Sequence, residues 1–184
     1  GISRLKFIFL KFFMKLSIFA SHKIIVDSQT AKKELIKIFP SIINKTKTIY
    51  LGVDKNRFGS TPTTFSINSR INIKKDNYFL TISSSVRYHC LIELISAYDT
   101  LNSQIKDLPK YLLISKNIDS EYFRKVNNFI STRNSSEKII LIENLDSNLL
   151  PSIYQNAELY IFSSYCEVFG FTNLEAMSCG CAVV

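Results

Sequence analysis

The sequence predicts an α/β fold built on a doubly wound parallel sheet, because short buried strands alternate with amphipathic helices. Apolar runs of strand length occupy residues 78–83, 111–115, 138–142 and 158–163, and helical spacing occupies residues 91–101, 120–130 and 147–155. The strand runs lack polar alternation, as expected where helices cover both faces of a parallel sheet. In such sheets the crossovers are right-handed, and ligands bind at the carboxyl ends of the strands.

The first part of the chain carries a shorter version of the same pattern. Residues 23–26 are predicted to form a buried strand, and Ser28 is predicted to cap a helix over residues 31–38 that ends before Pro40. Residues 48–50 are predicted to form a second strand.

Between the two parts the pattern dissolves into Ser, Thr, Asn and Lys around Pro62, which is typical of a linker. We therefore expect the tail of a first domain at residues 1–58, a linker at 59–77, and a second domain, truncated at its C-terminal end, at 78–184. The first residue is Gly1 rather than Met, and 184 residues leave little room for two complete domains, so we expect a fragment of a longer protein.

Charge is distributed unevenly along the chain. Residues 1–77 carry 15 Lys and Arg against 4 Asp and Glu, whereas residues 78–184 carry 8 against 11. The basic first part favours an anionic partner such as a membrane surface or a polyphosphate. Nucleic acid is not expected, because aromatic and basic residues do not interleave as they do in a recognised nucleic-acid module.

The four cysteines lack the spacing of a zinc site or of a redox Cys-x-x-Cys motif. They are Cys90, Cys166, Cys179 and Cys181. Their pattern indicates buried thiols in a reducing cytoplasm.

Residues 1–20 are apolar and rich in Phe, but four basic residues interrupt them, so no apolar run approaches the roughly 20 residues of a membrane span. Basic and apolar side chains fall on different helical faces: Arg4, Lys11 and Lys15 on one, and Phe7, Leu10, Met14 and Ile18 on another. This pattern predicts a basic amphipathic helix. It would lie either on an anionic membrane surface, at the inner face of the membrane, or against another part of the protein.

The turn after the last predicted strand contains most of the candidate functional residues. Glu167 and Glu175 lie in a loop and a short helical pattern that ends at Gly180. Gly170 permits a close backbone approach, and Thr172 is predicted to begin a helix whose free N–H groups form an anion site. Carboxylates beside an anion site suit a ligand that joins phosphates to hydroxyl-rich groups, as a nucleotide-sugar does. Alternatively, Thr172 and Glu175 form a capping box and Glu167 is a solvated loop residue.

These residues resemble a known family. The pair Glu167 and Glu175, with Phe169-Gly170-Phe171, Leu174-Glu175-Ala176-Met177 and Cys179-Gly180, is similar to the Glu-x7-Glu signature of the retaining glycosyltransferases of family four, also called glycosyl transferases group one. The stretches His22 to Ser28, Leu51-Gly52-Val53-Asp54 with Phe58, and Leu149 to Phe162 resemble other parts of that family in the same order.

The resemblance implies a GT-B fold, with two Rossmann-like domains and the active site in the cleft between them. It implies that Glu167 contacts the donor sugar near its reacting carbon and that Glu175 binds the ribose hydroxyls. The backbone of Phe169, Gly170, Phe171 and Thr172 would hold the sugar and diphosphate. The implied reaction transfers a glycosyl group from a nucleotide-diphosphate-sugar to a glycan or lipid-linked acceptor with retention of configuration, as in polysaccharide biosynthesis. No cofactor and no metal are expected.

The chain departs from the family where cations usually face the donor phosphates. Serines replace a glycine and an arginine after the strand at residues 78–83, and His89 stands where a lysine is expected. Arg87 is a candidate to supply the missing charge, because an Arg fork suits phosphate oxygens. The stretch Ser115-Lys116 replaces a further glycine.

Three functions remain open on this basis. The sequence favours a glycosyltransferase, with the 184 residues alone expected to be inactive. The missing lysine and glycines favour a non-catalytic relative that acts as a binding or scaffold protein at a membrane surface. The basic first part alone would suit a protein that binds an anionic surface.

Overall fold

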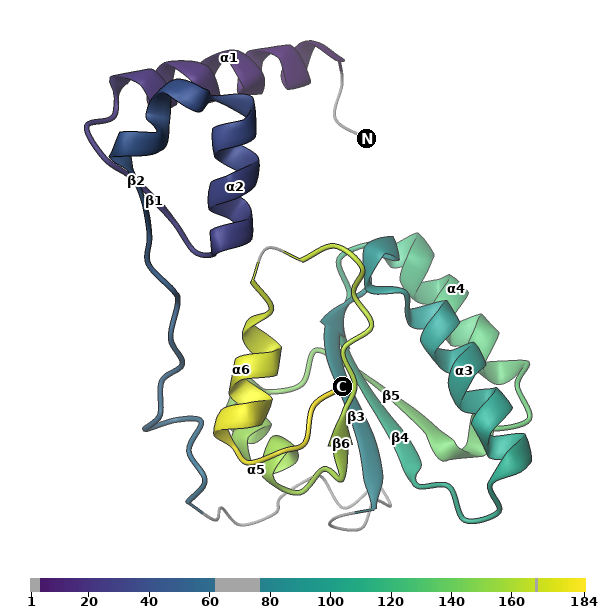
Figure 1. The fold of residues 1–184 in the computed structure, drawn as a ribbon. Helices are drawn as coiled ribbons and strands as arrows, with labels where there is room; N and C mark the ends of the chain where they lie inside the picture. Colours follow the sequence, from purple (N-terminus) through teal and green to yellow (C-terminus); the bar gives the residue numbers. More distant parts are fainter. Residues whose placement is uncertain (1–3, 62–76, 168) are drawn as a thin grey trace. The chain divides into compact units, whose positions relative to one another are not determined.

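The computed structural model describes residues 4–61, 77–167 and 169–184 (Figure 1). The described chain divides into two compact units, one ending at Gly52 and the other beginning at Val53. Most of the predicted linker at 59–77 lies outside the described residues.

The first unit is a small α/β arrangement. Its elements are α1 (Arg4–Ala20), β1 (Ile24–Val26), α2 (Gln29–Ile38), the 3₁₀ helix η1 (Pro40–Lys45) and β2 (Thr46–Thr48). Strands β1 and β2 pair in parallel, with Ile24 opposite Thr46. The predicted cap is confirmed, since the Ser28 side chain accepts a hydrogen bond from the Ala31 amide at 3.0 Å. The second strand lies two residues earlier than predicted, because the ladder with β1 begins at Thr46.

A lysine holds the end of α1 against the rest of the first unit. Lys45 Nζ donates to the carbonyl oxygens of Ile18 at 2.7 Å, Phe19 at 3.2 Å and Ser21 at 2.9 Å. These carbonyls lie at or just past the helix C-terminus, where no further helical N–H is available and where a cation is favoured by the helix dipole. Ile18 also joins a small buried cluster with Phe39 and Ile42.

The second unit is a four-stranded parallel sheet with strand order β5-β4-β3-β6. Its elements are β3 (Tyr78–Ser84), η2 (Arg87–His89), α3 (Leu91–Gln104), β4 (Lys110–Lys116), α4 (Ser120–Ser131), η3 (Ser136–Lys138), β5 (Ile139–Glu143), η4 (Ser147–Leu149), α5 (Leu150–Gln155), β6 (Leu159–Tyr160) and α6 (Phe171–Ser178). Helices α3 and α4 lie on one face of the sheet and α5 and α6 on the other (Figure 1). The predicted doubly wound α/β fold is confirmed.

Each face of the sheet has its own buried core, as alternation along the strands requires. Leu80 and Leu112 pack toward Ile153, Tyr154 and Ala176 of α5 and α6. On the opposite face, the core consists of strand residues Tyr111 and Leu113 with residues of α3 and α4, namely Leu91, Ile95, Tyr98, Tyr122, Val126 and Ile130. Because both faces are covered, the strands contain continuous apolar residues, which is the pattern read from the sequence.

The boundary between the units falls between Gly52 and Val53, whereas residues 1–58 were predicted to form the first part. The reason is packing by residues 53–61 on the second unit. Phe58 is buried with its ring 6.2 Å from that of Tyr154, and Arg57 Nη2 donates to the Ser147 carbonyl at 2.8 Å. Gln155 Nε2 donates to the carbonyls of Gly59 and Thr61 at 2.7 and 2.8 Å.

Strand β6 is shorter than the run predicted at residues 158–163, since only Leu159 and Tyr160 have strand geometry. Its backbone pairs with the last residues of the chain: Tyr160 donates to Ala182 and Phe162 donates to Val184, both at 2.8 Å. The turn that carries the two glutamates therefore leaves β6 at its carboxyl end and returns beside the same strand.

Candidate functional site

The turn at residues 161–170 leads from β6 into α6 at the carboxyl edge of the sheet. Gly170 precedes α6 with φ of +79°, a left-handed conformation that favours glycine. A Cβ at Gly170 would lie 3.0 Å from the Asn173 side-chain nitrogen. The helix begins at Phe171, one residue before the predicted start at Thr172. The first turn of α6 therefore directs its amides outward at the strand ends, where a ligand is expected.

Glu175 makes a partly buried contact within the second unit. Its Oε2 atom accepts a hydrogen bond from the Tyr154 hydroxyl at 3.0 Å. Burial raises the pKa of the Glu175 carboxyl, and the Tyr154 hydrogen bond and the charge of Arg57 partly offset that rise. The capping-box alternative is wrong, because Gly170 is the N-cap and α6 has no side-chain cap. One carboxylate oxygen is thus held by Tyr154, which fixes the orientation of the group.

Glu167, on the loop after β6, lies beside His89, which follows the neighbouring strand β3. Its Oε2 atom is 3.8 Å from His89 Nε2, and the Glu167 side chain is 34% exposed, whereas that of His89 is 11% exposed. The structure thus places His89 and Glu167 side by side, while Glu167 is an exposed residue on its loop, as the solvated-loop alternative expects. The catalytic roles of both residues stay predictions. The pair joins a carboxylate to a group that can carry a positive charge.

The other ring nitrogen of His89 is held by the backbone. Nδ1 lies 2.7 Å from the Ser84 carbonyl oxygen and 3.2 Å from the Ser84 amide nitrogen. Because a carbonyl can only accept, the shorter contact requires a proton on Nδ1, and the amide at 3.2 Å cannot donate to the same nitrogen. His89 therefore carries a proton on Nδ1 and presents Nε2 toward Glu167.

The two loops that carry His89 and Glu167 are joined by hydrogen bonds to the backbone. Ser163 Oγ donates to the His89 carbonyl at 2.5 Å, and the Tyr165 amide donates to the Tyr88 carbonyl at 3.1 Å. A longer bond of 3.4 Å runs from Ser164 Oγ to the Tyr88 carbonyl. These contacts fix the loop after β3 to the loop after β6.

Arg87 is exposed at the start of η2. Its charge contributes to the lowered pKa of the Glu121 carboxyl, which is dominated by the hydrogen bond from Lys125. Arg87 therefore lies within electrostatic range of the first turn of α4, and its predicted role at the donor phosphates stays a prediction.

The backbone predicted to hold the donor lies around Gly170. The rings of Phe169 and Phe171 are 5.4 Å apart and tilted, and Phe171 is exposed. Burial raises the pKa of Tyr160, and a hydrogen bond between Thr172 and the Tyr160 hydroxyl partly offsets that rise. The side chains of Phe171 and Thr172 thus diverge, one toward solvent and one toward β6. Their role in binding a donor stays a prediction.

A cavity of about 310 Å³ lies at the carboxyl ends of three neighbouring strands. Residues of β3 and β4 form part of its wall, namely Ile82, Ser83, Ile114, Ser115 and Lys116, and Asn144, Leu145 and Leu150 complete it. Its volume falls within the range of small-molecule sites, and its wall is largely apolar with a few polar groups. Asn144 has φ of +53°, and its amide donates to the Ser115 carbonyl at 3.2 Å.

Sequence reasoning did not select Asn144, Leu145 or Leu150, although they line this cavity. A signal was available, since they follow the predicted strand at residues 138–142 and ligands bind beyond the carboxyl ends of such strands. No single residue in that stretch carries a motif, so the rule of strand ends was the only indication.

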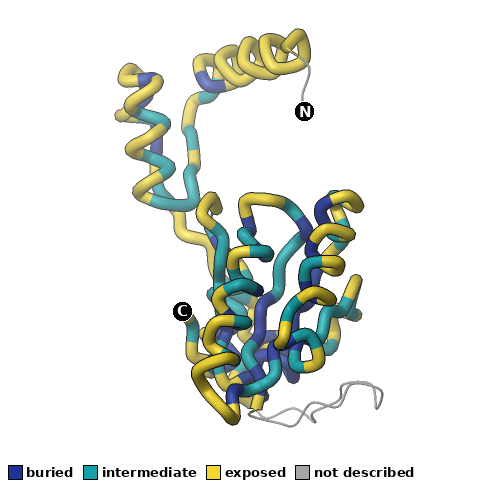
Figure 2. The backbone as a smooth tube through the Cα atoms, turned by 90° about the vertical axis from the view of Figure 1, so that its right-hand side faces the viewer, coloured by how far each residue is buried: buried dark blue, intermediate teal, exposed yellow. Residues whose placement is uncertain are grey.

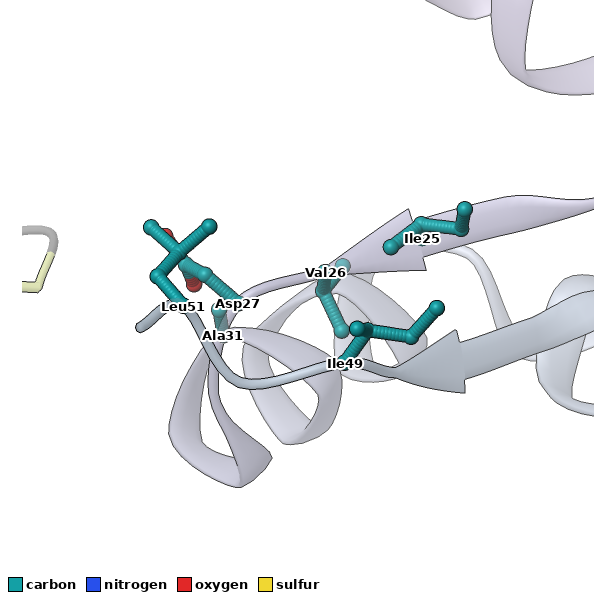
Figure 3. A pocket seen from close by; sticks show the side chains of 6 residues that line it. All are labelled: Ile25, Val26, Asp27, Ala31, Ile49 and Leu51. Carbon is teal, nitrogen blue, oxygen red and sulfur yellow. The ribbon is translucent and has the colours of Figure 1, made fainter. Parts of the chain in front are cut away.

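A second cavity of about 410 Å³ belongs to the first unit and lies beside β1 and past the end of β2 (Figure 3). Its wall consists of Ile25, Val26, Asp27, Ala31, Ile49 and Leu51. Five of these six side chains are apolar, and Asp27 supplies the one carboxylate. A single carboxylate among apolar side chains does not make a catalytic site.

Within residues 4–61, 77–167 and 169–184, no three His, Cys, Asp or Glu side chains gather closely enough to hold a metal ion. The four cysteines are free thiols. The predicted burial is confirmed for Cys179 and Cys181, but it is wrong for Cys90, which is half-buried, and for Cys166, which is exposed. The expectation that the reaction uses no metal or cofactor stays a prediction.

Comparisons with known proteins agree with this architecture. The family model described as glycosyl transferases group 1 matches residues 64–184. An uncharacterized glycosyltransferase of Methanocaldococcus jannaschii is 24% identical over 180 residues, which are 92% of this chain and 43% of that protein. The chain thus spans less than half the length of this relative.

Solved structures share the fold at low sequence identity. HepE of Anabaena, solved in complex with UDP and glucose, matches with a TM-score of 0.77 at 19% identity, over 92% of this chain and 45% of that one. Sucrose-phosphate synthase of Thermosynechococcus elongatus matches with a TM-score of 0.69 at 22% identity, over 86% and 39% of the two chains. The structural matches identify the parallel α/β fold as that of GT-B glycosyltransferases.

Proposed function

Since this chain belongs to the glycosyl transferases of group 1, we propose that it carries the donor-binding part of an enzyme that transfers a sugar from a nucleotide-diphosphate-sugar. The observation that carries the proposal is the placement of Glu167 and Glu175 around the start of α6 at the carboxyl edge of the sheet. The HepE structures, solved with UDP, UDP-glucose, or UDP and glucose, support this choice of donor class.

The nucleoside end of the donor is proposed to occupy the cavity of about 310 Å³. Its apolar walls suit a planar base, while Ser83, Ser115 and Asn144 offer polar groups for its edge. Glu175 would bind the ribose hydroxyls with the carboxylate oxygen that Tyr154 does not hold. The hydrogen bond from Tyr154 pre-orients the carboxylate, which lowers the entropy lost on binding.

The reacting end of the donor is proposed to lie beside the pair of Glu167 and His89, whose nearest atoms are 3.8 Å apart. In this arrangement Glu167 contacts the sugar near its reacting carbon, and the amides at the start of α6 hold the diphosphate. When the bond from the sugar to the diphosphate breaks, negative charge grows on the leaving oxygen. His89 and Arg87 would stabilise that charge, as positive groups aimed at a developing anion do. Transfer with retention of configuration is part of the proposal.

Removal of the Glu175 carboxylate tests donor binding. Loss of a charge-assisted hydrogen bond costs about 1.5–3 kcal/mol, so Glu175→Ala should weaken nucleotide-sugar binding about tenfold to hundredfold in calorimetry on the full-length protein. Glu137→Ala, at an exposed position on η3, is the matched control and should leave affinity unchanged. Equal affinities for wild type and Glu175→Ala would remove Glu175 from the donor site.

Membrane attachment through α1 is a second part of the proposal, with a glycan or a lipid-linked molecule as acceptor. Helix α1 is exposed along nearly its whole length (Figure 2). Of residues 4–20, only Ile18 is buried, and the exposed side chains include Leu5, Phe9, Phe12 and Phe19. Among the described helices, none is both long enough and apolar enough to cross a bilayer. Apolar side chains interrupted by Arg4, Lys11 and Lys15 suit a helix lying at an anionic interface.

Liposome flotation tests this attachment. The full-length protein should float with vesicles that contain anionic lipid, and Lys11→Glu with Lys15→Glu should reduce the floated fraction. Equal recovery with neutral and anionic vesicles, or no recovery with either, would contradict the interfacial role. The proposed place of the enzyme is accordingly the cytoplasmic face of a membrane.

A non-catalytic scaffold protein with the same fold is the competing function. The replacement of expected glycines and cations by Ser83, Ser84, Ser115 and His89 favours it. Turnover of a nucleotide-sugar by the wild-type full-length protein, lost in Arg87→Ala, would decide against this alternative. Binding of the donor without turnover would decide in its favour.

A further inference from the structure

His89 is the last residue of η2, and the carbonyl of the next residue, Cys90, accepts a hydrogen bond from the Leu94 amide of α3 at 3.0 Å. Within the loop, the amides of His89 and Cys90 donate to Val86 and Arg87. Residue Cys90 then adopts a left-handed conformation with φ of +52°, so the chain turns before α3 begins. The carbonyls of Tyr88 and His89 instead accept hydrogen bonds from residues 163–165, on the loop after β6.

We propose that Ser163 is a positioning residue, whose hydroxyl holds the backbone of His89 so that the imidazole stays against Glu167. This inference rests on the proposed function, in which His89 and Glu167 act at the reacting end of the donor. Ser163 contacts neither the sugar nor the diphosphate in this account; it acts through His89.

The geometry singles out Ser163 among the neighbouring hydroxyls. Its Oγ lies 2.5 Å from the His89 carbonyl, whereas Ser164 Oγ lies 3.4 Å from the Tyr88 carbonyl and makes its shorter bond, of 3.0 Å, to Cys166 within its own loop. The distance of 2.5 Å lies within the usual range of O–H···O hydrogen bonds, whereas 3.4 Å lies beyond it. Ser163 thus joins the two loops at the residue whose side chain faces Glu167.

The imidazole needs this backbone anchor because its remaining contact is local. Nδ1 bonds to the Ser84 carbonyl, five residues earlier, on the same loop and strand. That bond fixes the ring relative to β3 but not relative to Glu167, which lies on the loop after β6. Among the hydrogen bonds described for Tyr88 and His89, only those from residues 163–165 connect the loop after β3 to the loop after β6.

The first test uses NMR on the 184-residue chain and needs no donor. The sequence has two histidines, so His89 can be assigned with His22, in the first unit, as an internal reference. Glu167→Gln should shift the ring resonances of His89 in the wild-type background. In the Ser163→Ala background the same substitution should leave them unshifted, because the ring no longer lies against residue 167. Ser163→Thr, which keeps the hydroxyl, and Ser164→Ala should retain the wild-type shift.

The second test measures kinetics on the full-length enzyme. Ser163→Ala should lower kcat about tenfold with little change in KM for the donor, since the cavity and Glu175 carry ground-state binding. Ser163→Thr should restore kcat. A persisting effect of Glu167→Gln on His89 in the Ser163→Ala chain would overturn the inference. If Ser163→Ala abolishes the effect of Glu167→Gln on His89, the positioning role is supported. If the wild-type protein also binds no nucleotide-sugar, the proposed function is refuted while the positioning role stands.

Discussion

Tyr154→Phe tests the electrostatic account of Glu175 most sharply within the folded chain. Tyr154 is fully buried, and its hydroxyl donates to Glu175 Oε2 at 3.0 Å. Removing the hydroxyl leaves the carboxylate with one hydrogen bond fewer. A hydrogen bond to a charged group contributes about 1.5–3 kcal/mol, and we expect the lower end, about 1.5 kcal/mol, because water reaches part of the Glu175 side chain.

The loss should depend on pH with a defined sign. Burial raises the pKa of the Glu175 carboxyl, and the hydrogen bond from Tyr154 counters that rise, so Tyr154→Phe raises the pKa further. A folded-state pKa above the unfolded value destabilises the fold at pH values above that pKa, and the effect vanishes below the unfolded pKa. The difference in unfolding free energy between wild type and Tyr154→Phe should therefore shrink as pH falls through the pKa of Glu175.

Urea unfolding followed by circular dichroism at about pH 8 and about pH 4 measures this difference. Tyr154→Phe in a Glu175→Gln background is the control, because a neutral amide removes the titrating group and the pH dependence with it. Equal destabilisation by Tyr154→Phe at both pH values would refute the reasoning.

Three further substitutions test local geometry by the same unfolding measurement. Gly170→Ala should destabilise the fold by about 1–2 kcal/mol, because φ is +79° and the new Cβ would lie 3.0 Å from the Asn173 side chain; an unchanged midpoint would contradict this. Cys90→Gly should stabilise it by about 1 kcal/mol by relieving φ of +52°, and a loss of stability would count against the strain. Lys45→Met should cost about 1.5–3 kcal/mol and lower the helical signal of α1, since three carbonyls lose their cation; unaltered helicity would disagree.

The sheet could be predicted from local pattern because burial on both faces produces continuous apolar strands. Leu112 and Leu113, for example, point to opposite faces and are both fully buried. The Ser28 cap was equally accessible, since a cap involves only residues three positions apart. Such local rules gave the strand and helix positions of the second unit to within a few residues, except for β6.

Long-range packing produced the differences. Phe58 belongs to the second unit because it packs on Tyr154, and no pattern around residue 58 indicates that partner. Likewise Thr172 and Glu175 match a capping box in spacing, but the left-handed Gly170 starts the helix one residue earlier and Tyr154 takes the carboxylate. Contacts of this kind depend on residues distant in the sequence.

The sequence predicted several residues of the candidate site but not the contacts between them. The family resemblance selected Glu167 and His89, yet only the structure shows Nε2 at 3.8 Å from the carboxylate and Nδ1 on the Ser84 carbonyl. Ser163 gave no sequence signal, because a serine that bonds to a backbone carbonyl can occur in any loop.

The most direct test of the central claim is NMR mapping of a panel of nucleotide-diphosphate-sugars on the 184-residue chain. We expect at least one donor to shift the backbone amides at residues 82–84, 114–116 and 144–145, which border the cavity, together with those at 170–175. Glu175→Ala should weaken the response at all of these positions together. Shifts confined to the first unit, or no shift with any nucleotide-sugar, would contradict the claim that this edge of the sheet binds the donor.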